Sequence, residues 1–175
     1  MEKRTVYLIS GPAGVGKSTT TKKLGKSLKR SAYIEGDLID HMVAGGYVPP
    51  WESEELTALI WKNIISLCNN FLDANMDVVI DYITFPADAA MLKEAFQARN
   101  IELVYVVLMT DKEELLKRDS LRSPNAQMKE RCLVLVDEFM DSELQARFIL
   151  NTSGMTTEDL PAIISNIKTD PSFKL

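Results

Sequence analysis

A chain of 175 residues, 46% of them hydrophobic, is long enough for one domain with a full core. Its formal net charge of -5 disfavours general binding to nucleic acid, and no apolar run approaches the length of a membrane span. Cys68 and Cys132 lie far apart and outside any metal-ligand spacing. We therefore expect reduced thiols in or near a core, a cytoplasmic location, and neither nucleic acid nor membrane as a partner.

The first half of the chain alternates short apolar runs with longer stretches of helical period. This alternation predicts βα units around a parallel sheet. In chain order the pattern predicts a strand at 5–9, a helix at 17–29, a strand at 32–34, a short helix at 37–43 and a long helix at 53–72.

The second half continues the same alternation. Thr110 and Glu113 are spaced as a capping box for the helix that follows the fourth strand. The pattern predicts strands at 77–80, 103–109 and 148–150, and helices at about 86–100, after Thr110, at 127–140 and from 157 onwards. Five strands and about seven helices indicate a three-layer α/β/α domain that spans residues 1–175.

The strongest signal is the segment Gly11-Pro12-Ala13-Gly14-Val15-Gly16-Lys17-Ser18, which matches the P-loop pattern G-x-x-x-x-G-K-[ST] in full. It follows a predicted strand and opens a predicted helix. Glycines let backbone N–H groups turn towards phosphates, and the helix N-terminus adds partial positive charge. Lys17 can reach the β- and γ-phosphates, and Ser18 can offer its hydroxyl to Mg²⁺. We therefore expect ATP and Mg²⁺ as cofactors, with nucleotide contacts from Gly11, Ala13, Gly14, Val15, Gly16, Lys17, Ser18 and Thr19.

The loop, its place near residue 10 and the five βα units resemble the small P-loop kinases. This group includes nucleoside monophosphate kinases, shikimate and gluconate kinases, and antibiotic-modifying phosphotransferases. The resemblance covers the whole chain in length and order of elements, and it is strongest at the loop, where Gly14 gives the form G-x-x-G-x-G-K-S. It implies a P-loop NTPase fold of the nucleoside monophosphate kinase type with a five-stranded parallel sheet.

Two carboxylates follow predicted strands. Glu35-Gly36-Asp37 resembles the D-G-D-type segment of gluconate-type kinases, which implies that Asp37 contacts the hydroxyl of the acceptor. Aspartate is also a favoured N-cap, so Asp37 capping a helix at Leu38 is the competing interpretation. Asp81 closes an apolar strand like a Walker-B carboxylate, so we expect Ser18 and Asp81 to hold Mg²⁺.

The segment 38–75 is expected on the acceptor side. Within it, Tyr47 and Trp51 could form an apolar wall, although packing in the core explains Trp51 equally well and Trp61 better. His41 is the only histidine, and we interpret it as an ordinary polar residue.

A short lid is expected near residues 118–128. Arg118 and Arg122 are four apart and share a helix face, in the R-x-x-x-R spacing that resembles the lid arginines of small kinases. The resemblance implies that they grip the transferring phosphoryl group. A solvated face paired with Glu114 and Asp119 is the alternative. The loop Asn151-Thr152-Ser153-Gly154 would pass near the adenine.

The expected reaction is transfer of the γ-phosphoryl group of ATP to a hydroxyl of a small molecule, with Lys17, Asp37, Arg118 and Arg122 as the catalytic residues. The resemblance favours a gluconate-type sugar acid or an antibiotic as the acceptor, and the short lid disfavours a nucleoside monophosphate. An ATP-binding regulator without phosphotransfer stays open. A GTPase is disfavoured because the sequence has no N-K-x-D motif. The oligomeric state is not indicated.

Overall fold

A computed structural model describes residues 3–175. The strands are β1 (Arg4–Ser10), β2 (Ser31–Glu35), β3 (Asp77–Asp81), β4 (Ile101–Met109) and β5 (Ile149–Asn151). The helices are α1 (Lys17–Ser27), α2 (Gly36–Asp40), α3 (Glu54–Asp73), α4 (Pro86–Phe96), α5 (Lys112–Ser120), α6 (Glu130–Asp141) and α7 (Leu160–Thr169). One-turn 3-10 helices span Pro50–Glu52, Pro124–Ala126, Ala146–Phe148, Thr157–Asp159 and Pro171–Phe173.

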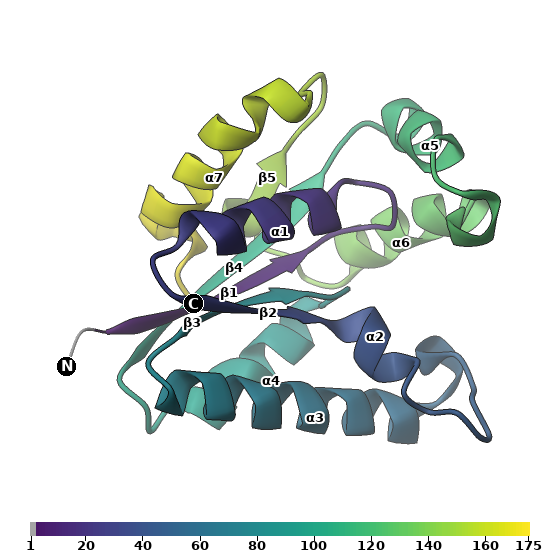
Figure 1. The fold of residues 1–175 in the computed structure, drawn as a ribbon. Coiled ribbons are helices and arrows are strands. Elements are labelled where there is room, and N and C mark those ends of the chain that lie inside the picture. The colour runs from purple at the N-terminus through teal and green to yellow at the C-terminus, as the bar shows by residue number, and fades with distance from the viewer. Residues whose placement is uncertain (1–2) are drawn as a thin grey trace.

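The five strands pair in parallel in the order β2-β3-β1-β4-β5. Helices cover both faces of the sheet, with α1 and α7 on one face and α3 and α4 on the other (Figure 1). The predicted three-layer α/β/α fold is confirmed. Because the strands are parallel, their carboxyl ends meet at one edge, which places the ends of β1, β2 and β3 side by side.

The two faces of the sheet carry separate cores because side chains along a strand alternate in direction. In β1, Val6 and Leu8 face α3 and α4, whereas Tyr7 and Ile9 face α1 and α7. The helical stripe predicted for α3 is buried at Ile60, Ile64 and Cys68 and half-buried at Leu56, Leu67 and Phe71. Cys68 and Cys132 are both buried and free, as expected. Among the described residues, no helix is long and apolar enough to cross a bilayer.

Two details of the predicted elements are wrong. Helix α5 begins at Lys112 with Asp111 as its N-cap, so Thr110 and Glu113 form no capping box, and the Thr110 hydroxyl bonds to Glu114 instead, at 3.1 Å.

Helix α6 begins at Glu130 rather than at residue 127. The backbone N–H groups of Met128 and Lys129 donate to the Asp119 carboxylate at 2.8–3.1 Å, and Lys129 has φ +48°. These contacts hold the preceding turn out of helical geometry.

Candidate functional site

The P-loop takes the backbone conformation that its glycines allow. Gly11, Gly14 and Gly16 have φ of +132°, +84° and +106°, values that side-chain-bearing residues rarely adopt. A Cβ at Gly11 would also collide with the carbonyl oxygen of Leu108 and come within 3.2 Å of Val15. The glycines are therefore required by geometry, and the loop leads directly into the N-terminus of α1. This arrangement fits a phosphate cradle.

Lys17 follows the glycines of the loop as the first residue of α1. Its ammonium donates to the carbonyl oxygens of Gly11 and Pro12 at 2.9 and 3.0 Å. Desolvation lowers the pKa of Lys17, and the negative charges of Asp81 and Asp37 oppose that shift. The loop thus holds a cation beside two carboxylates that come from two other elements.

Asp81 ends β3, in register with Ile9 of β1 and Glu35 of β2. It is buried, and its Oδ2 accepts from the hydroxyls of Tyr33 at 2.9 Å and Thr21 at 3.3 Å. These two donors fix the orientation of the carboxylate.

The donor set fits Mg²⁺ held partly by the nucleotide. No group of three or more His, Cys, Asp or Glu side chains that could hold a metal occurs in the described part of the chain. Ser18, which is exposed at the start of α1, and Asp81 together supply one hydroxyl and one carboxylate. Mg²⁺ commonly takes one or two carboxylates and completes its shell with water and substrate phosphates.

Asp37 lies inside the first turn of α2, whose N-cap is Glu35. The interpretation of Asp37 as the cap of a helix starting at Leu38 is therefore wrong. Asp37 is open to solvent, yet the protein around it raises its pKa by desolvation, against the lowering effect of Lys17. Glu35 is occupied elsewhere, because it pairs with Lys22 at 3.4 Å and lies 3.1 Å from the Tyr33 hydroxyl.

The position of α2 depends on Gly36. A Cβ at this residue would stand 2.8 Å from Cβ of Tyr82 and closer still to its ring, which is buried against Trp61. We expect Gly36→Ala to destabilise the fold by about 1–3 kcal/mol, because the root of the Tyr82 side chain cannot move aside. Thermal unfolding checks this. Gly45→Ala is the matched control, since a Cβ there meets nothing within 4 Å. Equal melting temperatures for the two variants would contradict the prediction.

Arg118 is bound to the protein itself. Its guanidinium donates to the carbonyl oxygens of Val15, Thr152 and Met155, each at 3.0 Å, and it pairs with Glu114. These bonds join α5 to the P-loop and to the loop after β5, which is the loop expected near the adenine. The predicted grip of Arg118 on the phosphoryl group remains a prediction, because both terminal nitrogens are occupied here.

Arg122 lies at the end of the same segment and is more exposed. It donates to Asp119 at 3.2 Å, and its charge contributes to lowering the pKa of Lys17. Asp119 is buried, not part of a solvated face, and it fixes the chain before α6. Of the two predicted lid arginines, Arg122 is thus the one whose charge acts on Lys17.

We expect replacement of Arg118 and of Arg122 by alanine to have different effects on the free energy of unfolding. Arg118→Ala removes bonds to three backbone carbonyls and the ion pair with Glu114, so the free energy of unfolding should fall by about 1–3 kcal/mol. Arg122→Ala should leave the unfolding free energy nearly unchanged, since its single ion pair is partly exposed. Urea titration of both variants gives the comparison. A fully stable Arg118→Ala protein would return Arg118 to the role of a free lid arginine.

Several residues of the site were missed by sequence reasoning. Tyr33 and Thr21 orient Asp81, and Asp40 is buried one turn after Asp37. Periodicity could have indicated the first two, because Tyr33 is two residues before Glu35 on a strand and Thr21 is four after Lys17 on a helix. Nothing in the sequence distinguishes Asp40 from a surface aspartate.

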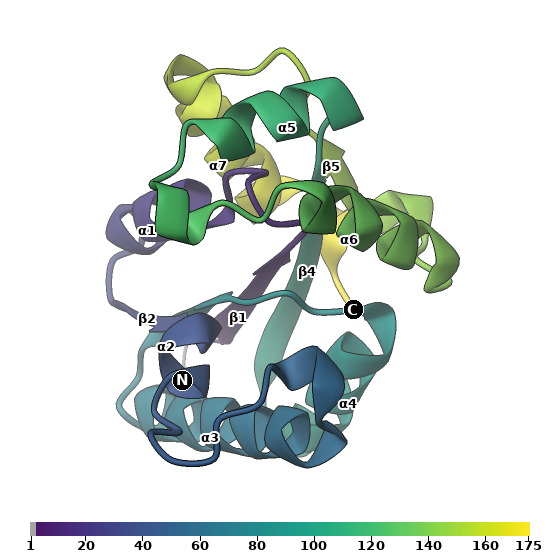
Figure 2. The same ribbon diagram turned by 90° about the vertical axis from the view of Figure 1, so that its right-hand side faces the viewer.

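The aromatic residues of the acceptor side divide as follows. Trp61 is buried in the core, as predicted. Trp51 is 61% exposed, so its core interpretation is wrong, and Arg131 of α6 stacks over its ring at 5.5 Å. His41 is exposed, with its ring 6.0 Å from that of Tyr47. Figure 2 shows α2 and α3 on one side of the carboxyl edge of the sheet and α5 and α6 on the other.

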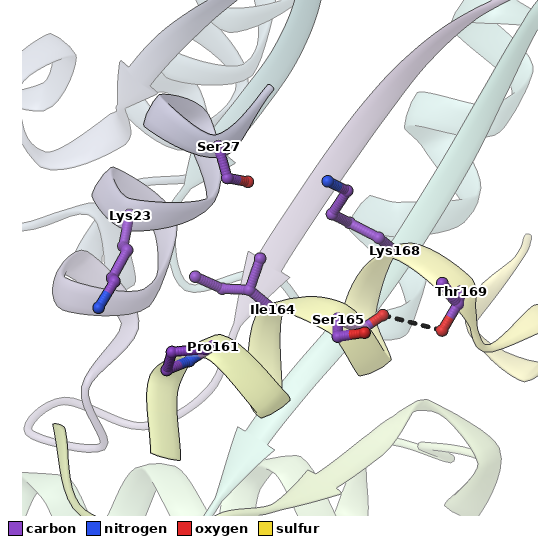
Figure 3. A pocket seen from close by; sticks show the side chains of 7 residues that line it. All are labelled: Lys23, Ser27, Pro161, Ile164, Ser165, Lys168 and Thr169. Carbon is purple, nitrogen blue, oxygen red and sulfur yellow. Dashed lines mark hydrogen bonds between the residues drawn. The ribbon is translucent and has the colours of Figure 1, made fainter. Parts of the chain in front are cut away.

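A shallow pocket of about 380 Å³ lies elsewhere, between α1 and α7. Figure 3 shows Ile164 and Pro161 on α7 facing Lys23 and Ser27 on α1. It is lined by none of the predicted site residues and contains no carboxylate, so it offers nothing for phosphoryl transfer.

The sheet order, the P-loop between β1 and α1, and the carboxylates at the ends of β2 and β3 define a P-loop nucleotide-binding protein with the fold of the small kinases. A model of the AAA domain family matches residues 8–145, and the chain belongs to this family. A search of curated proteins finds no match.

Solved structures of the same fold cover nearly the whole chain. A tunicamycin resistance protein from Deinococcus radiodurans has a TM-score of 0.66 at 18% identity, covering 95% of this chain and 96% of its own. The APS kinase of Mycobacterium tuberculosis, in complex with AMPPNP and APS, has a TM-score of 0.64 at 16% identity, covering 97% and 100%. A gluconokinase from Sinorhizobium meliloti has a TM-score of 0.61 at 17% identity, covering 94% and 89%. At these identities the likeness establishes the fold.

Proposed function

We propose that this protein is an ATP-dependent kinase that transfers the γ-phosphoryl group to a hydroxyl of a small molecule. The observation that carries the proposal is the P-loop beside the aligned ends of β1, β2 and β3, where Lys17 is bound to the loop carbonyls and the charges of Asp81, Asp37 and Arg122 act on it. These four residues were predicted separately from four different segments. Two of the structures with this fold are kinases by name, one of them with a nucleotide analogue bound.

Each group has a chemical role in this proposal. Lys17 and Arg122 offset the charge that develops on the transferring phosphoryl oxygens. Asp37, beside Lys17, accepts the proton of the acceptor hydroxyl or orients its oxygen. Ser18 and Asp81 would hold Mg²⁺, which neutralises phosphate charge when bound. Residues 118–128 act as the lid that excludes water, and 38–75 form the acceptor side of the single domain.

The test is ADP release from ATP and Mg²⁺ over a panel of sugar acids, sugars, nucleosides, nucleoside monophosphates and hydroxylated antibiotics. Stimulation by one acceptor, absent in a Lys17→Ala blank, is the expected result. Tight binding of ATP without stimulation by any acceptor would instead support the regulatory alternative.

A further inference from the structure

The acceptor side carries an unusual charge distribution. Between Ser31 and Trp61 the sequence has no lysine or arginine, and the same holds between Asp77 and Leu92. The first of these segments contains six acidic residues, namely Glu35, Asp37, Asp40, Glu52, Glu54 and Glu55. A site for an anionic acceptor is normally built from arginine or lysine side chains. The only lysine or arginine in the segment 38–75 is Lys62, which is exposed on α3.

Asp40 has a buried carboxylate oxygen that lacks a hydrogen-bond donor within residues 3–175. It is only 5% exposed, and its Oδ2 accepts from the Tyr47 hydroxyl at 2.9 Å. Its Oδ1 is buried and accepts no hydrogen bond from the described residues. Asp40 lies three residues after Asp37 on α2. Desolvation raises the pKa of the Tyr47 hydroxyl, and the charges of both carboxylates raise it further. A buried carboxylate oxygen without a donor costs free energy, and an N–H or O–H group of a ligand would recover it.

Lys17 acts on Asp37, but its ammonium is bound to the P-loop carbonyls and serves the nucleotide phosphates in the proposed function. Three other basic residues are already paired with other carboxylates. Arg131, which reaches across to Trp51, donates to both carboxylate oxygens of Glu138, at 2.6 and 3.2 Å. Lys22 pairs with Glu35, and Arg122 pairs with Asp119. The charges of these three side chains are therefore engaged by carboxylates other than Asp37 and Asp40.

We infer that the acceptor is a hydroxylated molecule without negative charge, and that Asp37 and Asp40 favour one that carries an amine, such as an amino sugar or amino alcohol. The inference rests on the proposed kinase function. Several exposed apolar side chains lie near these carboxylates in the sequence, namely Leu38, Met42, Tyr47 and Trp51. They offer apolar contact to the uncharged part of the acceptor. Of the two acceptors suggested by the sequence, a gluconate-type sugar acid is then the disfavoured one.

The test uses three probes with one carbon skeleton and different charge: glucosamine, glucose and gluconate. Each is titrated into the full chain saturated with AMPPNP and Mg²⁺, with binding followed by ligand-observed NMR. The expected order of affinity, from tightest to weakest, is glucosamine, glucose and gluconate. The affinities of glucosamine and gluconate should differ at least about tenfold, because the first is a cation and the second an anion. Gluconate binding as tightly as glucosamine, or no difference among the three, overturns the inference.

Variants assign the effect to the carboxylates. Asp40→Asn should weaken glucosamine about tenfold and glucose less than twofold, with AMPPNP affinity unchanged. Asp37→Asn should discriminate in the same way and serves if Asp40→Asn does not fold. Glu94→Gln, an exposed acid on α4, is the control and should change neither affinity. Equal losses for glucosamine and glucose would overturn the assignment. Failure of AMPPNP to bind the parent protein would overturn the proposed function itself, and this inference with it.

Discussion

Lys17→Ala is expected to lower nucleotide-dependent turnover by roughly 10²- to 10³-fold while leaving the fold intact. The ammonium is the only side-chain cation within the P-loop segment 11–18, and it is bound to the loop carbonyls of Gly11 and Pro12. Removing it deprives the phosphates of a charge placed where negative charge develops in the transition state. Gly11 and Pro12 are buried, so their carbonyls lose a donor, but the change also removes the cost of desolvating the ammonium, and stability should change little.

The measurement is ADP release at saturating ATP, with melting temperature recorded on the same samples. Lys26→Ala is the matched control, because Lys26 is an exposed lysine in the last turn of the same helix. It should keep the parent rate. Unchanged turnover in Lys17→Ala, or an equal loss in Lys26→Ala, would show that Lys17 has no specific part in the reaction and would contradict the proposed function.

The P-loop and the fold could be predicted from sequence because their signals are local. The P-loop requires particular residue types at fixed spacing, and a strand covered on both faces is apolar throughout. The long helix α3 follows from its apolar stripe.

What could not be predicted depends on contacts between distant segments. Asp119 reads as a surface charge beside Arg118 and Arg122, but the fold buries it against the chain before α6, where it delays the start of that helix. Arg118 reads as a free lid arginine, but it reaches three carbonyls, of which Val15 is 103 residues away. Spacing within a helix predicts which side chains share a face, and it does not predict what that face meets.

The last prediction concerns Asp37, whose replacement should slow phosphoryl transfer and at the same time stabilise the fold at neutral pH. Asp37→Asn keeps the shape of the side chain and removes its ability to take a proton. We expect ATP binding to be retained and phosphoryl transfer to fall by about 10²- to 10⁴-fold. Glu55→Gln is the control, because it alters an exposed acid at the start of α3. Asp88→Asn would be a poor control, because the Asp88 carboxylate caps α4. Transfer at the parent rate in Asp37→Asn would remove Asp37 from the reaction.

The raised pKa of Asp37 gives the same residue a signature in stability. In the protein without nucleotide, the folded state holds the Asp37 proton more tightly than the unfolded state does. The contribution of Asp37 to stability is therefore fully present below the ordinary carboxyl pKa and is lost as the pH rises through the raised value. At neutral pH, Asp37→Asn should be more stable than the parent, and the difference should vanish in acid. Denaturant titrations across that pH range test this prediction. A variant less stable than the parent at neutral pH would contradict it. That result would show that Lys17 already compensates the charge of Asp37 in the free protein, so that keeping a carboxylate at this position costs no stability.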